Sequence, residues 1–311
     1  MVKQFSNDIG FSNCALCANS TDIQQSHIIP SFVYEWLVNT SATGFMRFGE
    51  TPNLRVQDGW KPKMLCGDCE QNFALLEKRF ADNCFYPIIN GEKAQIHYET
   101  WMLKFATSVS WRVLRSFKAI GGLDGFPPNI LEAVEDALST WKAFLFDEAP
   151  HPGRHEQHLI LIDGIESTSL QNVPENINRY LLRAIEIYVA YTPDSAITYA
   201  KMGKIILFGF IENPHPRRWK GTKINVKEGR FGVSDIELPS DVGEFIMDRA
   251  RRAAERTKQM SEKQKDRIAE TYRKDMDRAA DSETIRAMTH DVLLFGDSAF
   301  EATQGDSEES T

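Results

Sequence analysis

The sequence predicts an α+β protein, and three kinds of pattern lead to that expectation. Four of the five cysteines lie in two CxxC pairs, Cys14–Cys17 and Cys66–Cys69, a spacing typical of a metal-held finger. Apolar residues recur at helical spacing in several later segments. Short β-branched runs bounded by turn residues indicate strands in the middle of the chain. We therefore expect an N-terminal finger followed by helices, a small mixed α/β unit and a long C-terminal helix.

The cysteine pairs predict a structural zinc site. In each CxxC turn the two intervening residues form a tight knuckle, so both sulfurs can face one ion. Four thiolates fill all positions of tetrahedral zinc and leave none open for a substrate. The alternative is a redox CxxC or an incidental pair. Cys84 is left over among aromatic residues, where it is expected to be a small buried apolar residue.

A lone histidine, His27, lies between the two cysteine pairs. It follows Ser26 and precedes Ile-Ile-Pro, and the segment Ser26–Pro30 is short and apolar, which predicts a strand that ends at the proline. Because four cysteines already fill a zinc site, His27 is available for other chemistry.

An amphipathic helix is predicted over 70–81, directly after the last cysteine. Glu70 and Glu77 lie two turns apart on one face of this helix, among apolar residues. A carboxylate on an apolar stripe is costly unless it is paired or binds a metal ion. We therefore expect the helix to bring one or two carboxylates near His27.

These features resemble the HNH endonucleases of the His-Me finger (ββα-metal) superfamily, zinc-bearing type, over about residues 10–82. The resemblance is carried by the first CxxC, by His27 before Ile-Ile-Pro, and by Leu-Cys-x-x-Cys at the start of a helix. It implies a treble-clef-like ββα-metal finger. It also implies that His27 is a general base that activates water, and that magnesium or manganese neutralises the phosphate. DNA is the substrate it implies first, and RNA the second.

Two positions depart from the family pattern. Ser26 stands where the family often has an aspartate, and Glu70 where it usually has asparagine or histidine as a metal ligand. Magnesium prefers carboxylate oxygens and water, so the catalytic metal is expected to depend on Glu70. Glu77, Asn72 and Ser26 are the further candidate ligands.

The chain is expected to divide into four consecutive segments. These are an HNH-like zinc finger nuclease domain (1–90), an accessory helical and α/β domain (91–240), a long basic helical segment (241–290) and an acidic, disordered tail (291–311). Helices are predicted over 31–38, 98–120, 129–146, 177–190 and 241–280. Strands are predicted over 43–49, 54–60, 158–165, 196–200 and 204–211. The first two strands would form a hairpin inserted in the finger.

The formal net charge of −8 counts against a protein that coats DNA indiscriminately, because neutralising phosphates supplies nonspecific affinity. A local basic patch is still compatible with that sum. The candidate nucleic-acid-binding residues form one short stretch with an interleaved aromatic ring: Arg217, Arg218, Trp219, Lys220 and Lys223. The alternative interpretation is a solvated loop, and the sequence leaves both open.

Two other classes of function remain open. The first is a noncatalytic zinc module that binds nucleic acid or a protein, and the departures at Ser26 and Glu70 favour it. In the second, the accessory region acts, as a homo-oligomer or with a protein partner, and the finger only assembles. The first ten residues lack the pattern of a signal peptide, and no apolar run is long enough to span a bilayer. We therefore expect a cytoplasmic protein with no membrane association and with its cysteines reduced.

Overall fold

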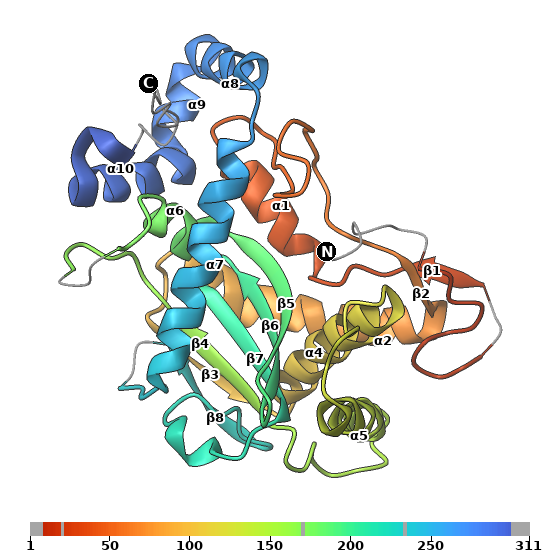
Figure 1. The fold of residues 1–311 in the computed structure, drawn as a ribbon. Helices are drawn as coiled ribbons and strands as arrows, with labels where there is room; N and C mark the ends of the chain where they lie inside the picture. Colours follow the sequence, from red (N-terminus) through yellow and green to blue (C-terminus); the bar gives the residue numbers. More distant parts are fainter. Residues whose placement is uncertain (1–8, 20–21, 169–171, 233–234, 300–311) are drawn as a thin grey trace, which may run out of the picture. The chain divides into compact units, whose positions relative to one another are not determined.

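The structure is a computed structural model, and its fold is drawn in Figure 1. It describes residues 9–19, 22–168, 172–232 and 235–299. The expected α+β class is confirmed, since helices and antiparallel strands are both extensive.

The chain forms two compact units, each built from segments that are distant in sequence. Unit 1 comprises the described residues of 1–33, 59–161 and 185–239; unit 2 comprises those of 34–58, 162–184 and 240–311. The units therefore interleave along the chain instead of following the four consecutive segments that we expected. Only the boundary near residue 240 coincides.

The N-terminal part of unit 1 is a pair of strands followed by a helix. Strand β1 (Ile23–Gln25) pairs antiparallel with β2 (Lys63–Cys66), and α2 (Gly67–Phe80) begins directly after β2. The strand predicted over Ser26–Pro30 was wrong, because the register shifts after Gln24 and regular pairing ends before Ser26. Single backbone bonds continue along this segment, such as Ser26 N to the Pro62 carbonyl at 2.9 Å.

Helix α2 continues into a π-helical segment (Ala81–Phe85) and the short α3 (Tyr86–Ile89). This region is anchored by aromatic contacts, among them Phe80 stacked on Phe105 with ring centroids 3.9 Å apart. Cys84 is fully buried here, as expected, and burial raises the pKa of its thiol well above the usual value.

The core of unit 1 is a four-stranded antiparallel sheet in the order β4-β7-β6-β5 (Figure 1). Its strands are β4 (Gln157–Leu161), β5 (Ile185–Tyr191), β6 (Ala196–Met202) and β7 (Ile205–Glu212). Helices α4 (Trp101–Ala119) and α5 (Pro128–Leu145) pack against it. Gly209 of β7 permits the close approach of α4, since a Cβ there would lie 2.5 Å from the Ser110 hydroxyl.

Two helix predictions in this part of the chain need correction. The helix expected over 177–190 ends early: α6 (Ile177–Arg183) is followed by β5, whose residues pair with β6 along its whole length. Cross-strand pairing thus overrides the apolar pattern that we read as helical. The helix expected over 98–120 begins later, at Trp101 of α4. Tyr98 lies instead in β3 (Gln95–Glu99), which pairs with β8 (Glu228–Gly232).

Unit 2 is mostly helical. Its C-terminal helices are α7 (Ser240–Lys258), α8 (Glu262–Lys274), α9 (Met276–Asp281) and α10 (Glu283–Phe295), followed by a 3₁₀ turn (Gly296–Ala299). The single helix expected over 241–280 was therefore wrong. Its breaks fall at Ser261, which has extended backbone, and at Asp275, whose side chain accepts from Arg278 N and caps α9.

The remaining predictions for unit 2 fall on its first and last segments. Helix α1 (Ser31–Asn39) begins at the expected serine. The hairpin expected over 43–60 reduces to one bridge between Met46 and Val56. The acidic tail expected from residue 291 begins inside α10, where Asp291 is fully buried, and residues 300–311 lie outside the described residues.

In the described part of the chain, no helix is both long enough and apolar enough to cross a membrane.

Lys201 in β6 gives a testable pH dependence. The side chain is fully buried, donates to the Gly203 carbonyl and lies opposite Glu186 of β5. Burial lowers the pKa of Lys201 from 10.5 to about 7, against the opposing effect of Glu186. Between these two values the unfolded chain binds a proton that the folded chain does not, so the free energy of unfolding should rise with pH across that window. Each unit of pKa difference is worth about 1.4 kcal/mol.

We therefore expect Lys201→Met to raise the free energy of unfolding at pH 6 and to flatten its rise between pH 7 and 10.5. Urea titrations at several pH values measure this. The exposed Lys227→Met is the control and should follow the wild-type curve. A Lys201→Met curve parallel to wild type across the window would show that burial does not shift this lysine.

Candidate metal centre

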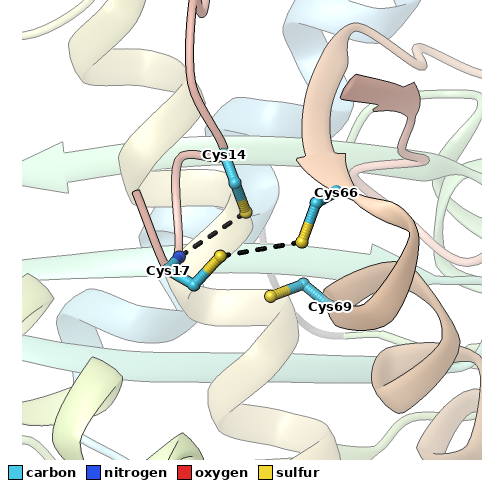
Figure 2. Close-up of side chains that lie close together, drawn as sticks. All are labelled: Cys14, Cys17, Cys66 and Cys69. Carbon is cyan, nitrogen blue, oxygen red and sulfur yellow. Dashed lines mark hydrogen bonds between the residues drawn. The ribbon is translucent and has the colours of Figure 1, made fainter. Parts of the chain in front are cut away.

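Four cysteine sulfurs converge at one end of unit 1 (Figure 2). Cys14 and Cys17 come from the loop before β1, Cys66 is the last residue of β2, and Cys69 lies in the first turn of α2. All four sulfurs lie within 4.8 Å of one another, with Cys17 Sγ 3.6 Å from Cys66 Sγ. The structure thus brings together the two CxxC pairs that the sequence singled out.

Backbone hydrogen bonds hold this arrangement. The first knuckle closes through Cys17 N, which donates to Cys14 Sγ at 3.5 Å, and through Ala18, which takes a positive φ of 66°. Ala15 N donates to the Met64 carbonyl at 2.9 Å and so joins the first knuckle to β2. Because Cys66 ends that strand, the backbone places the two pairs side by side.

The thiols have distinct electrostatic surroundings. Burial opposes ionisation of Cys14, but backbone hydrogen bonds from Cys17, Cys66 and Leu16 outweigh it and lower the pKa of Cys14 to about 7. Burial raises the pKa of Cys69, and its neighbouring cysteines raise it further. A bound cation would favour the thiolate form of all four. This cluster of four sulfurs is compatible with a structural zinc ion and fills its four positions.

A second group of polar residues adjoins the cluster in sequence. Ser26 is completely buried, and its hydroxyl donates to Glu70 Oε2 at 2.5 Å. Glu70 follows Cys69 directly and is half-buried, as is His27, which follows Ser26. The residue before the histidine and the residue after the last cysteine are therefore in direct contact. Of the residues predicted for the catalytic metal, these are the two that the structure brings together.

Arg112 of α4 is the residue that sequence reasoning missed. It is 1% exposed, and its Nη1 donates to the His27 carbonyl at 2.5 Å. Its Nη2 lies 2.6 Å from Glu77 Oε1, and its guanidinium lies over the Phe73 ring at 5.3 Å from the centroid. The angles at this contact do not fit a hydrogen bond, and neither Nη2 nor Glu77 Oε1 makes a hydrogen bond to any described residue. The contact is therefore an ion pair only.

The charge of Glu77 is thus balanced by an arginine, which accounts for a carboxylate on an apolar helix face. A signal for this pair was present in the sequence, since Arg112 interrupts the apolar residues of the helix predicted over 98–120. A buried arginine also requires a partner. Asn72, the remaining candidate ligand, is exposed on α2.

The residues of the basic stretch lie in unit 1 and differ in exposure. Trp219 is buried against His158, Phe208 and Phe210, with ring centroids 5.1–5.3 Å away, so its ring packs in the core and is not a surface for bases to stack on. Apolar neighbours from the sheet compete successfully for the ring. Two lysines of the stretch are ion-paired, Lys220 with Glu237 at 2.5 Å and Lys223 with Glu156. Arg217 and Arg218 are exposed in a 3₁₀ turn (Pro216–Arg218).

Comparisons with protein-family models, with curated proteins and with solved structures found no match to this chain.

We expect the purified protein to carry one tightly bound zinc ion per chain, because metal binding to such a cluster supplies folding energy. Cys66→Ser should lose the ion and lower the thermal unfolding temperature, whereas the control Cys84→Ala should keep it, since Cys84 lies outside the cluster. Metal analysis by mass spectrometry and thermal unfolding measure both effects. A zinc-free wild-type protein whose unfolding is insensitive to chelators would contradict the zinc site.

The Arg112–Glu77 pair gives a second test. Arg112→Met leaves Glu77 half-buried without its counterion, and breaking a buried pair costs about 3–5 kcal/mol, less here because Glu77 is partly solvated. The double variant Arg112→Met/Glu77→Gln should recover part of that loss. The exposed pair of Arg79 and Glu99 serves as control, and Arg79→Met should cost at most about 1 kcal/mol. Denaturant unfolding measures each variant, with Glu77→Gln alone completing the cycle; a double-variant loss equal to the sum of the two single losses would rule out coupling.

Proposed function

We propose that this protein is a metal-dependent endonuclease of the HNH type that hydrolyses phosphodiester bonds in DNA. One observation carries the proposal: the Ser26 hydroxyl bonds the Glu70 carboxylate, which ties the residue before His27 to the residue after Cys69. A histidine and a carboxylate are thereby held on one framework of two strands, a helix and a cysteine cluster.

In this proposal His27 is the general base. Imidazole is the side chain best suited to accept a proton near neutral pH, and the proton here is taken from the attacking water. The backbone at His27 is fixed on both sides: Arg112 donates to its carbonyl, and Ser26 before it is bonded to Glu70. Such fixing serves catalysis because a base that is already in place needs no reorganisation during the reaction.

Glu70 is the proposed ligand of a magnesium or manganese ion. Its carboxylate and the Ser26 hydroxyl are oxygen donors of the kind that these ions take. Glu77 is a weaker candidate because Arg112 balances its charge, and Asn72 lies exposed on α2. When bound, the ion would stabilise negative charge on the phosphate. The four cysteines hold a structural zinc ion and keep the framework folded.

The alternative is a noncatalytic zinc module that binds nucleic acid or a protein. A specific observation favours it. The position before the histidine offers a hydroxyl where the resemblance calls for a carboxylate, and Glu77 is already committed to Arg112. Of the predicted carboxylate ligands only Glu70 is then left for a metal ion, and weak metal binding would leave a folded module without activity.

Cleavage assays decide between the two. With magnesium or manganese, the wild-type protein should nick supercoiled plasmid, and His27→Ala should lower the rate by about a hundredfold to ten-thousandfold, the usual contribution of a general base. Glu70→Gln keeps an oxygen acceptor for Ser26 but removes the charge, and it should lower cleavage and weaken the dependence on magnesium. Linear duplex, single-stranded DNA and RNA of the same sequence define the substrate.

The matched control is His97→Ala, which removes an exposed histidine of β3. It should cleave as wild type does, and all variants should keep their zinc. If wild type cleaves none of these substrates with either metal, or if His27→Ala cleaves as fast as the control, the protein is not a nuclease of this type and the binding module is favoured.

A further inference from the structure

Two arginines of unit 2 lie beside a backbone bridge in the loop 40–58. Met46 and Val56 form an antiparallel bridge with two backbone bonds, Met46 N to Val56 O at 2.9 Å and Val56 N to Met46 O at 3.0 Å. The next residues toward the tip of the loop are Arg47 and Arg55, whose charges are close enough to affect each other. Like charges in such positions repel. This placement is unfavourable unless something negative lies between them.

Arg47 has donors that nothing in its surroundings accepts. Its Nε and Nη2 are buried, and neither has a hydrogen-bond partner among the residues that the structure describes. A guanidinium group carries five N–H donors and no acceptor, so only an oxygen or another acceptor can satisfy it. Burial lowers the pKa of Arg47, the positive charge of Arg55 lowers it further, and Tyr272 raises it. The net lowering reflects the cost of this charge in its present surroundings.

Other arginines of unit 2 show how this unit ordinarily treats a buried cation. Arg183 pairs with Glu283 at 2.9 Å and also donates to the Leu37 carbonyl. Arg179 pairs with the buried Asp291 at 2.7 Å. The carboxylate closest in sequence to Arg47, that of Glu50, is already paired with Arg256 at 3.1 Å. Within the described residues, Arg47 has no ion-pair partner, and it differs in this from its neighbours.

Arg55 is the more exposed of the two arginines. It is exposed, and its guanidinium lies over the Phe45 ring at 5.2 Å from the centroid. A ring beneath one face of a guanidinium leaves its N–H edge available to a ligand. Arg55 is exposed and Arg47 is half-buried with its Nε and Nη2 covered, so a ligand can reach those two donors only if the residues that cover them move.

We propose that Arg47 and Arg55 bind a phosphate group. Two guanidinium groups supply two positive charges and two planar sets of donors, which suit the several oxygens and the charge of a phosphate. A carboxylate offers two oxygens in one plane and a single charge, so it satisfies fewer of these donors. The phosphate belongs either to a free nucleotide or to a nucleic-acid backbone. The site lies in unit 2, whereas the proposed catalytic residues lie in unit 1, so the proposal does not rest on the proposed function.

The first test uses inorganic phosphate and the full-length, zinc-loaded protein without magnesium. At constant ionic strength, phosphate should raise the thermal unfolding temperature of wild type and bind measurably in calorimetry, while acetate should do neither. Arg47→Met and Arg55→Gln should each weaken phosphate binding at least tenfold. Arg252→Gln is the matched control, because Arg252 is an exposed arginine of α7 already paired with Asp248, and it should bind as wild type does.

A second measurement separates a binding role from a structural one. Without ligand, Arg47→Met should unfold at the wild-type temperature or above it, because it removes a buried charge that has no partner. A structural role predicts a lower temperature. The proposal is overturned if phosphate has no more effect than acetate on wild type, or if both variants bind phosphate as tightly as the control.

Two further probes identify the source of the phosphate. A nucleoside monophosphate is titrated by calorimetry, and a labelled DNA duplex by fluorescence anisotropy over a salt series. If the nucleic-acid backbone is the ligand, Arg47→Met should weaken duplex binding. It should also lower the slope of the logarithm of affinity against the logarithm of salt concentration by about one, the contribution of one phosphate contact. If the nucleotide binds and Arg47→Met leaves duplex binding unchanged, the ligand is the free nucleotide. If neither binding depends on Arg47, the proposal fails.

Discussion

The Arg112 guanidinium is the contact on which the candidate centre depends. It lies fully buried in α4, the helix that packs on the four-stranded sheet, and from there it reaches both the His27 carbonyl and the Glu77 carboxylate. A buried guanidinium is tolerated only where its donors and its charge are satisfied. To satisfy Arg112, the segment of His27 must supply its carbonyl and helix α2 must supply the Glu77 carboxylate, so both segments are held near α4. The sheet core of unit 1 thereby constrains two segments of the metal-binding end.

The cysteine cluster supplies the complementary constraint. Strands of three and four residues, such as β1 and β2, form a sheet too small to be stable by itself. The four thiols, of which Cys14 has a lowered pKa and Cys17 and Cys69 have raised ones, gain a common partner only when a cation binds. Metal binding and the antiparallel pairing of these strands are therefore expected to stabilise each other. Ser26 and Glu70 come together as a consequence, since Ser26 directly follows β1 and Glu70 directly follows Cys69 in the first turn of α2.

The sequence was informative where a short spacing determines the structure. The CxxC pairs and the helices that begin at Ser31 and Pro128 are determined within a few residues, and they appear as expected. The prediction failed where partners distant in sequence decide. Strand β5 has an apolar pattern that fits a helix equally well, and only pairing with β6 makes it a strand. The ion pair of Glu77 and Arg112 joins residues of two helices, so we assigned the carboxylate to a metal when its partner was an arginine.

Charge pairing also distinguishes structural groups from candidate ligand sites. Arg112, Arg179 and Arg183 are each buried or half-buried beside a carboxylate, which accounts for them within the fold. Glu70 is partnered by the neutral hydroxyl of Ser26, and Arg47 keeps two donors without an acceptor among the described residues. Among the described residues, the folded chain thus leaves a carboxylate hydrogen-bonded to a neutral hydroxyl in one unit and a guanidinium with two donors that have no acceptor in the other. A cation bound at Glu70 and an anion bound at Arg47 would remove these two imbalances, and each would do so without help from the other.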